Sequence, residues 1–127
     1  MWLSIDEKDN RPLYLQIINQ IKDQVNRGTI KAGDELPSVR ELADSLGINL
    51  HTVRSAYLKL RDQGIIDLRL GRRARIARLP DLSGNTDTRE GLSRRIKEII
   101  TDAQLMGLST ADIRDLVNGQ LKQKKEE

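Results

Sequence analysis

Residues 38–64 read SVRELADSLGINLHTVRSAYLKLRDQG and contain two short helical patterns with a glycine between them. The first pattern opens with Ser38 and Glu41, the spacing of a capping box. In this motif the serine oxygen accepts a hydrogen bond from the N–H three residues on, and the glutamate reaches back. Apolar residues then recur at helical spacing, at Val39, Leu42, Ala43 and Leu46. The spacing predicts a short helix over residues 38–45.

The second pattern follows Gly47, which permits a tight turn. Asn49 is a favourable N-cap and Gly64 a favourable end, so a second helix is predicted over residues 50–63. Two short helices joined by a turn that contains glycine predict a helix-turn-helix.

A further helix is predicted before this pair. Pro12 suits the first turn of a helix, where its missing N–H is not needed, and Gly28 suits the end. The residues between them predict a helix over 12–27, with apolar side chains at Leu13, Ile17, Ile18, Ile21 and Val25.

A β-hairpin is predicted after the pair. Residues 65–70 and 74–78 alternate apolar and polar side chains around a turn that begins at Gly71. The expected hairpin exposes three arginines on its strands and two at its tip: Arg69, Arg75, Arg78, Arg72 and Arg73. The predicted fold class is therefore mainly α with a small β-hairpin, a winged helix-turn-helix followed by further helices.

Residues 80–88 (PDLSGNTDT) have the composition of a linker. A helix is predicted over 88–106, Gly107 ends it, and Ser109 to Asp112 cap a last helix before a frayed tail, KQKKEE. We therefore predict three parts: a DNA-binding winged helix over 1–79, a linker over 80–88 and a helical dimerisation hairpin over 89–127.

Two amphipathic helices cannot enclose a core, so their apolar faces need another surface. A second copy of the chain is the expected occupant, and the alternative is that the helices fold back on their own winged helix. The residues expected at a dimer interface are Leu92, Ile96, Ile99, Ile100, Ala103, Leu108, Ile113, Leu116, Val117 and Leu121.

The amino-acid composition excludes several kinds of site and structure. The chain has 127 residues, no cysteine, a single histidine and a net charge of +3, so disulfides and thiolate metal sites are excluded. We expect no membrane span, because no apolar run approaches the ~20 residues that one needs. The N-terminus lacks the pattern of a secretory signal, so the cytoplasm is the expected compartment.

The single histidine, His51, lies in the first turn of the second helix of the pair. At helical spacing Val53, Ala56, Tyr57 and Leu60 share one face, which predicts the core, and His51 falls nearly opposite. Catalytic and metal roles for His51 lack partner residues, so we expect no catalytic residue, metal or cofactor. It is either an idle surface histidine or a base contact, since the N-terminal residues of this helix touch base edges in helix-turn-helix proteins.

Other residues add possible DNA contacts. Arg40 can reach a phosphate or a guanine, Thr52 a phosphate or a thymine methyl, and Ser38 either caps its helix or contacts DNA. Five arginines and no acid lie within residues 69–78, which favours a polyanion, and Arg72 and Arg73 are expected along phosphates or in a minor groove.

Several blocks closely resemble the GntR family of bacterial transcription regulators. They are residues 36–43 (LPSVRELA), 46–49 (LGIN), 52–54 (TVR), 56–60 (AYLKL) and 64–66 (GII), with a lead-in at 12–17 (PLYLQI). The short C-terminus is similar to that of the YtrA subfamily.

The resemblance implies a homodimeric regulator, usually a repressor, that binds a palindromic double-stranded DNA operator and dimerises through its C-terminal helices. The family's DNA contacts fall on Arg40, Asn49, Leu50, His51, Thr52, Arg54 and Gly71. Two departures from the family pattern stand out. The subfamily's Asn-Pro-Asn is Asn49-Leu50-His51, and the wing's Gly-x-Gly-Thr-Phe-Val is Gly71-Arg72-Arg73-Ala74-Arg75-Ile76.

Two other functions remain open on the sequence alone. A winged helix can act as a protein–protein adaptor, or as an architectural DNA-binding protein without sequence preference. The regulatory signal is also open: either an unknown small-molecule effector exists, or there is none.

Overall fold

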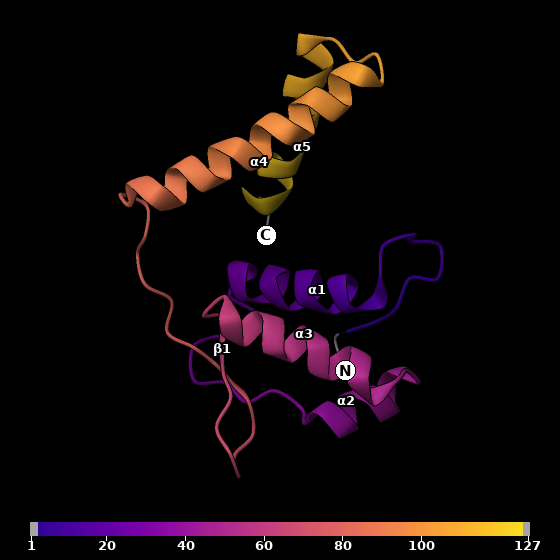
Figure 1. Cartoon of the computed structure of the whole chain (residues 1–127), viewed down its shortest axis with the longest axis vertical. Coiled ribbons are helices and arrows are strands. Elements are labelled where there is room, and N and C mark those ends of the chain that lie inside the picture. Colours follow the sequence, from indigo (N-terminus) through magenta and orange to yellow (C-terminus); the bar gives the residue numbers. More distant parts are fainter. Residues whose placement is uncertain (1–2, 126–127) are drawn as a thin grey trace. The chain divides into compact units, whose positions relative to one another are not determined.

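The computed structural model describes residues 3–125, which divide into two compact units on either side of the boundary between Leu79 and Pro80. The first unit contains α1 (Leu13–Arg27), α2 (Val39–Leu46), α3 (Leu50–Asp62), β1 (Ile66–Asp67) and β2 (Arg75–Ile76), and the second contains α4 (Thr86–Leu105) and α5 (Thr110–Lys125) (Figure 1). Three helices followed by a two-stranded hairpin confirm the predicted winged helix-turn-helix.

Helix α1 begins one residue later than predicted, with Pro12 as its N-cap. It ends at Gly28, where φ of +78° lets the glycine N–H donate to the carbonyls of Gln24 and Val25. Its buried face contains Ile17, Ile18 and Ile21, whereas Leu13 at its start is exposed.

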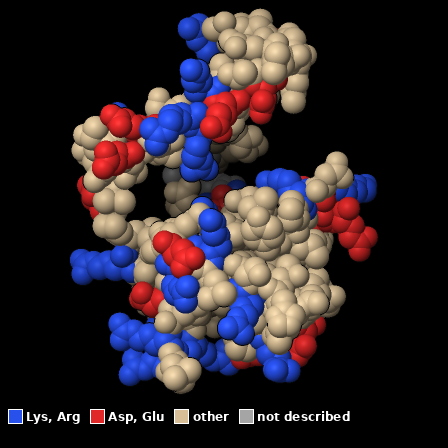
Figure 2. Space-filling view, in the orientation of Figure 1, with Lys and Arg blue, Asp and Glu red and all other residues tan. Residues whose placement is uncertain are grey.

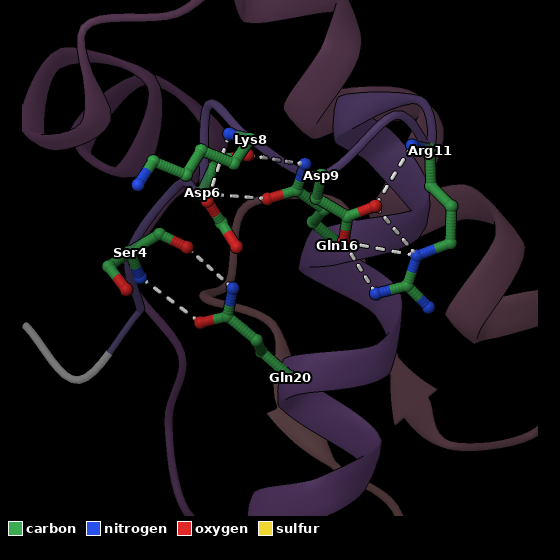
Figure 3. Close-up of polar contacts among 7 residues, drawn as sticks. All are labelled: Ser4, Asp6, Lys8, Asp9, Arg11, Gln16 and Gln20. Atoms are coloured by element: carbon green, nitrogen blue, oxygen red, sulfur yellow. Dashed lines mark hydrogen bonds and ion pairs between the residues drawn. The ribbon is translucent and has the colours of Figure 1, made fainter.

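Two glutamines of α1 fasten the segment that precedes the helix (Figure 3). Buried Gln16 accepts from the Asp6 N–H at 3.0 Å and donates to the Asp6 carbonyl at 3.3 Å. Gln20 makes the same pair of bonds with Ser4, at 3.0 and 2.5 Å. Each side-chain amide thus pairs with one backbone unit as a neighbouring strand would, which the helical pattern alone did not predict.

Both helices of the helix-turn-helix begin at the predicted caps. The Ser38 hydroxyl accepts from the Glu41 N–H at 3.0 Å, and the Asn49 side-chain oxygen (Oδ1) accepts from the His51 N–H at 2.7 Å. Between the helices Gly47 has φ of +67°, the left-handed conformation that the tight turn requires. The sequence therefore placed this turn and both helix starts within one residue.

Helix α3 lies at the centre of the first unit and packs against both α1 and α2. The predicted core face is confirmed, since Val53, Ala56, Tyr57 and Leu60 are all fully buried. The Tyr57 hydroxyl donates to the Pro37 carbonyl at 2.7 Å, which joins α3 to the segment before α2. The position of α2 on α3 is thus fixed by apolar packing and by a partly buried hydrogen bond.

The β-strands of the wing are shorter than predicted. Its antiparallel strands have two residues each, with Ile66 opposite Ile76 and Asp67 opposite Arg75. The alternation predicted a strand through Leu70, but β1 ends at Asp67 and Leu70 is fully exposed. Residues 33–36 pair instead with the far side of β2, through the Leu36 N–H to Ala74 carbonyl bond at 2.8 Å and an isolated bridge between Glu35 and Arg75.

The second unit starts and ends its helices close to the predicted positions. Asn85 caps α4, so this helix begins two residues before the prediction. Ser109 and Asp112 form a reciprocal capping box, with bonds of 2.9 and 3.1 Å, and α5 begins at Thr110. The predicted frayed tail over 122–127 is wrong for its first part, because α5 continues to Lys125; residues 126 and 127 lie outside the described residues.

Candidate nucleic-acid interface

Four of the predicted DNA-contact residues lie around one shallow surface hollow between α2 and α3. Its lining includes Ser38 and Arg40 from the start of α2 and Leu50 and Arg54 from the first half of α3. The two arginines are exposed, and Ser38 and Leu50 are half-buried. The helix-turn-helix therefore brings a cap, two cations and an apolar side chain onto one face, although they come from separate helices.

Three further predicted residues lie at the start of α3, outside the lining of this hollow. Asn49 is exposed, and its side-chain oxygen is occupied by the cap bond to His51. His51 is exposed and Thr52 half-buried. The cap fixes where the helix begins, so the His51 side chain leaves the first turn on the side away from the buried face.

The tip of the wing is a four-residue turn. The Arg72 N–H donates to the Arg69 carbonyl at 3.1 Å, and Gly71 has φ of +78°, as the third residue of a type II turn requires. Fully exposed Leu70 is at the apex between Arg69 and Arg72. Within residues 3–125 the side chains of these two arginines make no ion pair. In Figure 2 the blue of Lys and Arg side chains is concentrated at the lower left, over the hairpin that Figure 1 draws at the bottom.

The other two arginines near the tip are paired with acids of the helix-turn-helix. Arg73, predicted at the tip, bonds Glu41 in the first turn of α2 at 2.6 Å and lies 3.9 Å from Glu35. Arg75 bonds Glu35 at 2.7 Å and donates to the Gly33 carbonyl at 3.0 Å. These pairs are not evident from the sequence, because the partners are more than thirty residues apart in the chain.

The ion pairs change the electrostatics of the capping box. The Arg73 guanidinium beside Glu41, with help from the Ser38 hydroxyl, holds the pKa of that carboxyl below its ordinary value. Glu41 is therefore charged at neutral pH and is compensated by the wing. Burial raises the pKa of Tyr57, and the nearby Glu41 charge raises it further, so the tyrosine stays protonated as a donor to Pro37.

The ten residues predicted for a dimer interface divide by exposure. Six are exposed on α4 and α5, namely Leu92, Ile96, Ile99, Leu116, Val117 and Leu121, and four are half-buried, namely Ile100, Ala103, Leu108 and Ile113. Leu105 and Met106, which the prediction left out, are also exposed. Within its described residues this unit has no buried side chain, so it has no core of its own.

The described residues hold neither a cluster of metal ligands nor a membrane-spanning helix. No group of three or more histidine, aspartate and glutamate side chains there is arranged to hold a metal ion. Within residues 3–125, no helix is both long enough and apolar enough for a membrane span.

The order of elements and the exposed helix start define a winged helix-turn-helix protein. The sequence model described as "Bacterial regulatory proteins, gntR family" matches residues 13–76. The chain belongs to this family of regulators and is not an enzyme.

Similarity over nearly the whole chain identifies the branch of the family. The HTH-type transcriptional repressor YtrA of Bacillus subtilis is 34% identical over 119 residues, which cover 91% of this chain and 88% of that protein. The crystal structure of a transcriptional antiterminator from Listeria monocytogenes has a TM-score of 0.83 at 30% identity and covers 94% of this chain and 90% of its own. The chain is a YtrA-like member of the GntR family.

The similar solved structures include complexes with operator DNA. The DNA-binding domain of AraR in complex with operator ORE1 has a TM-score of 0.51 at 27% identity and covers 57% of this chain and 89% of its own. Family membership and this likeness make the chain a DNA-binding transcription regulator.

Proposed function

We propose that the chain is a homodimeric repressor that binds a palindromic operator in double-stranded DNA, with α3 in the major groove and the wing on the adjacent backbone. The observation that carries this proposal is the exposed surface around the start of α3, where Arg40, His51 and Arg54 lie on the side away from the core. Sequence-specific regulators read base edges with such residues at the start of the second helix.

The side chains have distinct roles in this proposal. His51 contacts a base edge, and Leu50 lies against a thymine methyl, since both project from the first turn of α3. Arg40 binds a phosphate or a guanine, and Arg54 and Thr52 bind the backbone beside the groove. Asn49 and Ser38 hold the two helix starts through their caps and add contacts where the backbone of the DNA passes.

The wing extends the contact beyond α3. Gly71 lets the turn approach the DNA closely, because it has no side chain and adopts a positive φ. Exposed Arg72 neutralises a phosphate or enters a minor groove, where arginine is attracted to the strong negative potential. Arg73 lies next to this turn and belongs to the same cationic surface.

Dimerisation follows from the apolar residues of α4 and α5. These helices expose six large aliphatic side chains of the predicted interface, far more than a helix that remains in water normally presents. A second copy offers the same face, which satisfies the self-complementarity of a two-fold interface. A dimer also has two α3 helices, one for each half-site of a palindromic operator.

We propose repression because a protein that is similar over most of the chain is named a repressor. YtrA of Bacillus subtilis is named a transcriptional repressor. A bound dimer over a promoter would exclude polymerase and needs no further activity. The cytoplasm is the proposed compartment, because bacterial DNA is there, and an effector that releases the repressor is either an unknown small molecule or absent.

Selection from random duplexes tests the proposal. Bound duplexes are sequenced after several rounds, and the mass of the complex is measured by ultracentrifugation. We expect an inverted repeat, half-sites about one helical turn apart, and two chains on each duplex. Transcription in vitro from a promoter that carries the selected site should fall when the protein is added.

Other results identify the competing functions. Binding without enrichment of any sequence indicates an architectural protein, for which the arginine-rich wing is the supporting observation. A single half-site bound by one chain contradicts the homodimer. A rise in transcription indicates an activator. If no duplex is retained in the selection, the DNA-binding function is contradicted and a protein–protein adaptor is the alternative.

A further inference from the structure

Four of the five wing arginines form two groups with different surroundings. Arg69 and Arg72 flank the exposed apex at Leu70 and make no ion pair among residues 3–125. Arg73 and Arg75 are turned toward Glu35 and Glu41, with nitrogen–oxygen distances of 2.6 Å for Arg73–Glu41 and 2.7 Å for Arg75–Glu35. A count of positive charges on the wing therefore overstates the number that face outward.

The Arg73–Glu41 pair lies where backbone support for the wing ends. Residues 74–76 are held by the backbone of residues 33–36, through the Leu36–Ala74 bond and the bonds of Ile76. Among residues 3–125, the turn at 69–72 makes its only backbone hydrogen bond within itself, from the Arg72 N–H to the Arg69 carbonyl. Between these parts, Arg73 makes the side-chain contact that joins the free tip to the first turn of α2.

We propose that Glu41 is a positioning residue of the DNA-binding surface, which holds Arg73 so that Arg69, Leu70 and Arg72 meet the DNA while Arg73 itself neutralises no phosphate. This inference rests on the proposed DNA-binding function and removes Arg73 from the predicted contacts. Arg73 stands where the family pattern has the second wing glycine, so the ion pair replaces a flexible position with a fixed one.

Charge at the interface supports this division. Glu41 begins the same helix as Arg40, and its charge is compensated by Arg73 at 2.6 Å. If Arg73 turned to a phosphate, Glu41 would remain uncompensated on a surface that faces a polyanion, and repulsion would offset the new contact. Arg72 can bind a phosphate without exposing an acid.

Salt dependence distinguishes a phosphate contact from a positioning role. Each neutralised phosphate contributes about 0.9 to the slope of log K against log salt concentration. We expect Arg72→Gln to lower the slope by about that amount. Arg73→Gln should weaken binding to the selected duplex by roughly three- to thirtyfold through the loosened wing, with the slope unchanged. A slope lowered equally by both variants overturns the proposal.

Charge exchange gives an independent readout. Arg73→Glu alone should bind poorly, because two acids then face each other, and the double variant Glu41→Arg with Arg73→Glu should recover most of the affinity. Glu41→Arg alone is the control for added positive charge. If Arg73 binds a phosphate, glutamate at position 73 still repels DNA and the double variant shows only the sum of the single effects, which overturns the proposal.

DNA binding by the wild-type protein distinguishes a failure of this inference from a failure of the proposed function. If the wild-type protein binds no duplex, both the DNA-binding function and the positioning role of Glu41 are overturned. Normal binding by the wild type, with no recovery in the exchanged pair, overturns the positioning role alone. Circular dichroism and unfolding midpoints check that each variant is folded, which is expected because the three substituted side chains, Glu41, Arg72 and Arg73, are all exposed.

Discussion

At the scale of single residues, two caps determine where side chains leave the helix-turn-helix. The Asn49 oxygen that accepts from the His51 N–H fixes the first turn of α3, so His51 leaves it exposed. The Ser38 oxygen does the same for α2, and Arg40 is exposed two residues on. Cap chemistry thus places the proposed base and phosphate contacts.

His51→Ala should change which operator bases matter. A lost base contact costs ~1–3 kcal/mol and relaxes discrimination at the base pair that it reads. Binding is measured by anisotropy against the selected duplex and its single-base variants. Gln63→Ala, at the exposed far end of α3, is the control and should bind every duplex as the wild type does. A His51 variant with the wild-type base preferences would show that the histidine is an idle surface residue.

Ser38→Ala should destabilise the protein by about 0.5–2 kcal/mol, because the Glu41 N–H loses its partner. Urea unfolding followed by circular dichroism measures the change. Ser38→Asp restores an acceptor at the cap and should recover most of the stability. An alanine variant as stable as the wild type would indicate that the cap contributes nothing.

At the scale of elements, α3 combines a core face with a recognition face. Val53, Ala56, Tyr57 and Leu60 are fully buried, so this helix cannot rotate to present other side chains without exposing them. The rigidity of the proposed reading surface is therefore a consequence of packing.

Leu60→Ala should lower the free energy of unfolding by about 2–5 kcal/mol, because it leaves a cavity beside α3. Leu70→Ala removes the same atoms from a fully exposed side chain and should change stability by less than about 0.5 kcal/mol. Urea unfolding of both variants provides the comparison. Similar losses from the two would contradict the assignment of α3 to the core.

The helices and the existence of the hairpin were predictable from the sequence, whereas the length of the wing strands and the contacts of the wing were not. The caps at Ser38 and Asn49 and the stripe on α3 depend on residues a few positions apart, so local patterns determine them. The wing depends on contacts between distant segments, such as Glu41 with Arg73, and its strands are too short for alternation to be reliable. Leu70 was misplaced for this reason, and two of the five arginines that indicated a cationic surface, Arg73 and Arg75, are paired with acids.

At the scale of the whole molecule, the two units differ in how they are stabilised. The first has a core to which all three of its helices contribute, whereas the described residues of the second have none. The second unit therefore depends on another surface, and its stability should depend on protein concentration if that surface is a second copy.

Ile99→Glu should weaken dimerisation by at least about tenfold, since it places a charge within the apolar face of α4. Sedimentation equilibrium measures the dimer dissociation constant. Thr101→Glu adds the same charge on the opposite side of α4 and serves as the matched control. If both variants or neither dissociated, this face would not be the dimer interface.

The most direct test of specific DNA binding compares two duplexes of identical composition. Fluorescence anisotropy measures the affinity of the wild-type protein for the selected inverted repeat and for a scrambled duplex, over a series of salt concentrations. We predict nanomolar binding of the inverted repeat, at least ~10³ tighter than the scrambled duplex at moderate salt. Equal affinity for both, with the same steep dependence on salt, would contradict a sequence-specific regulator.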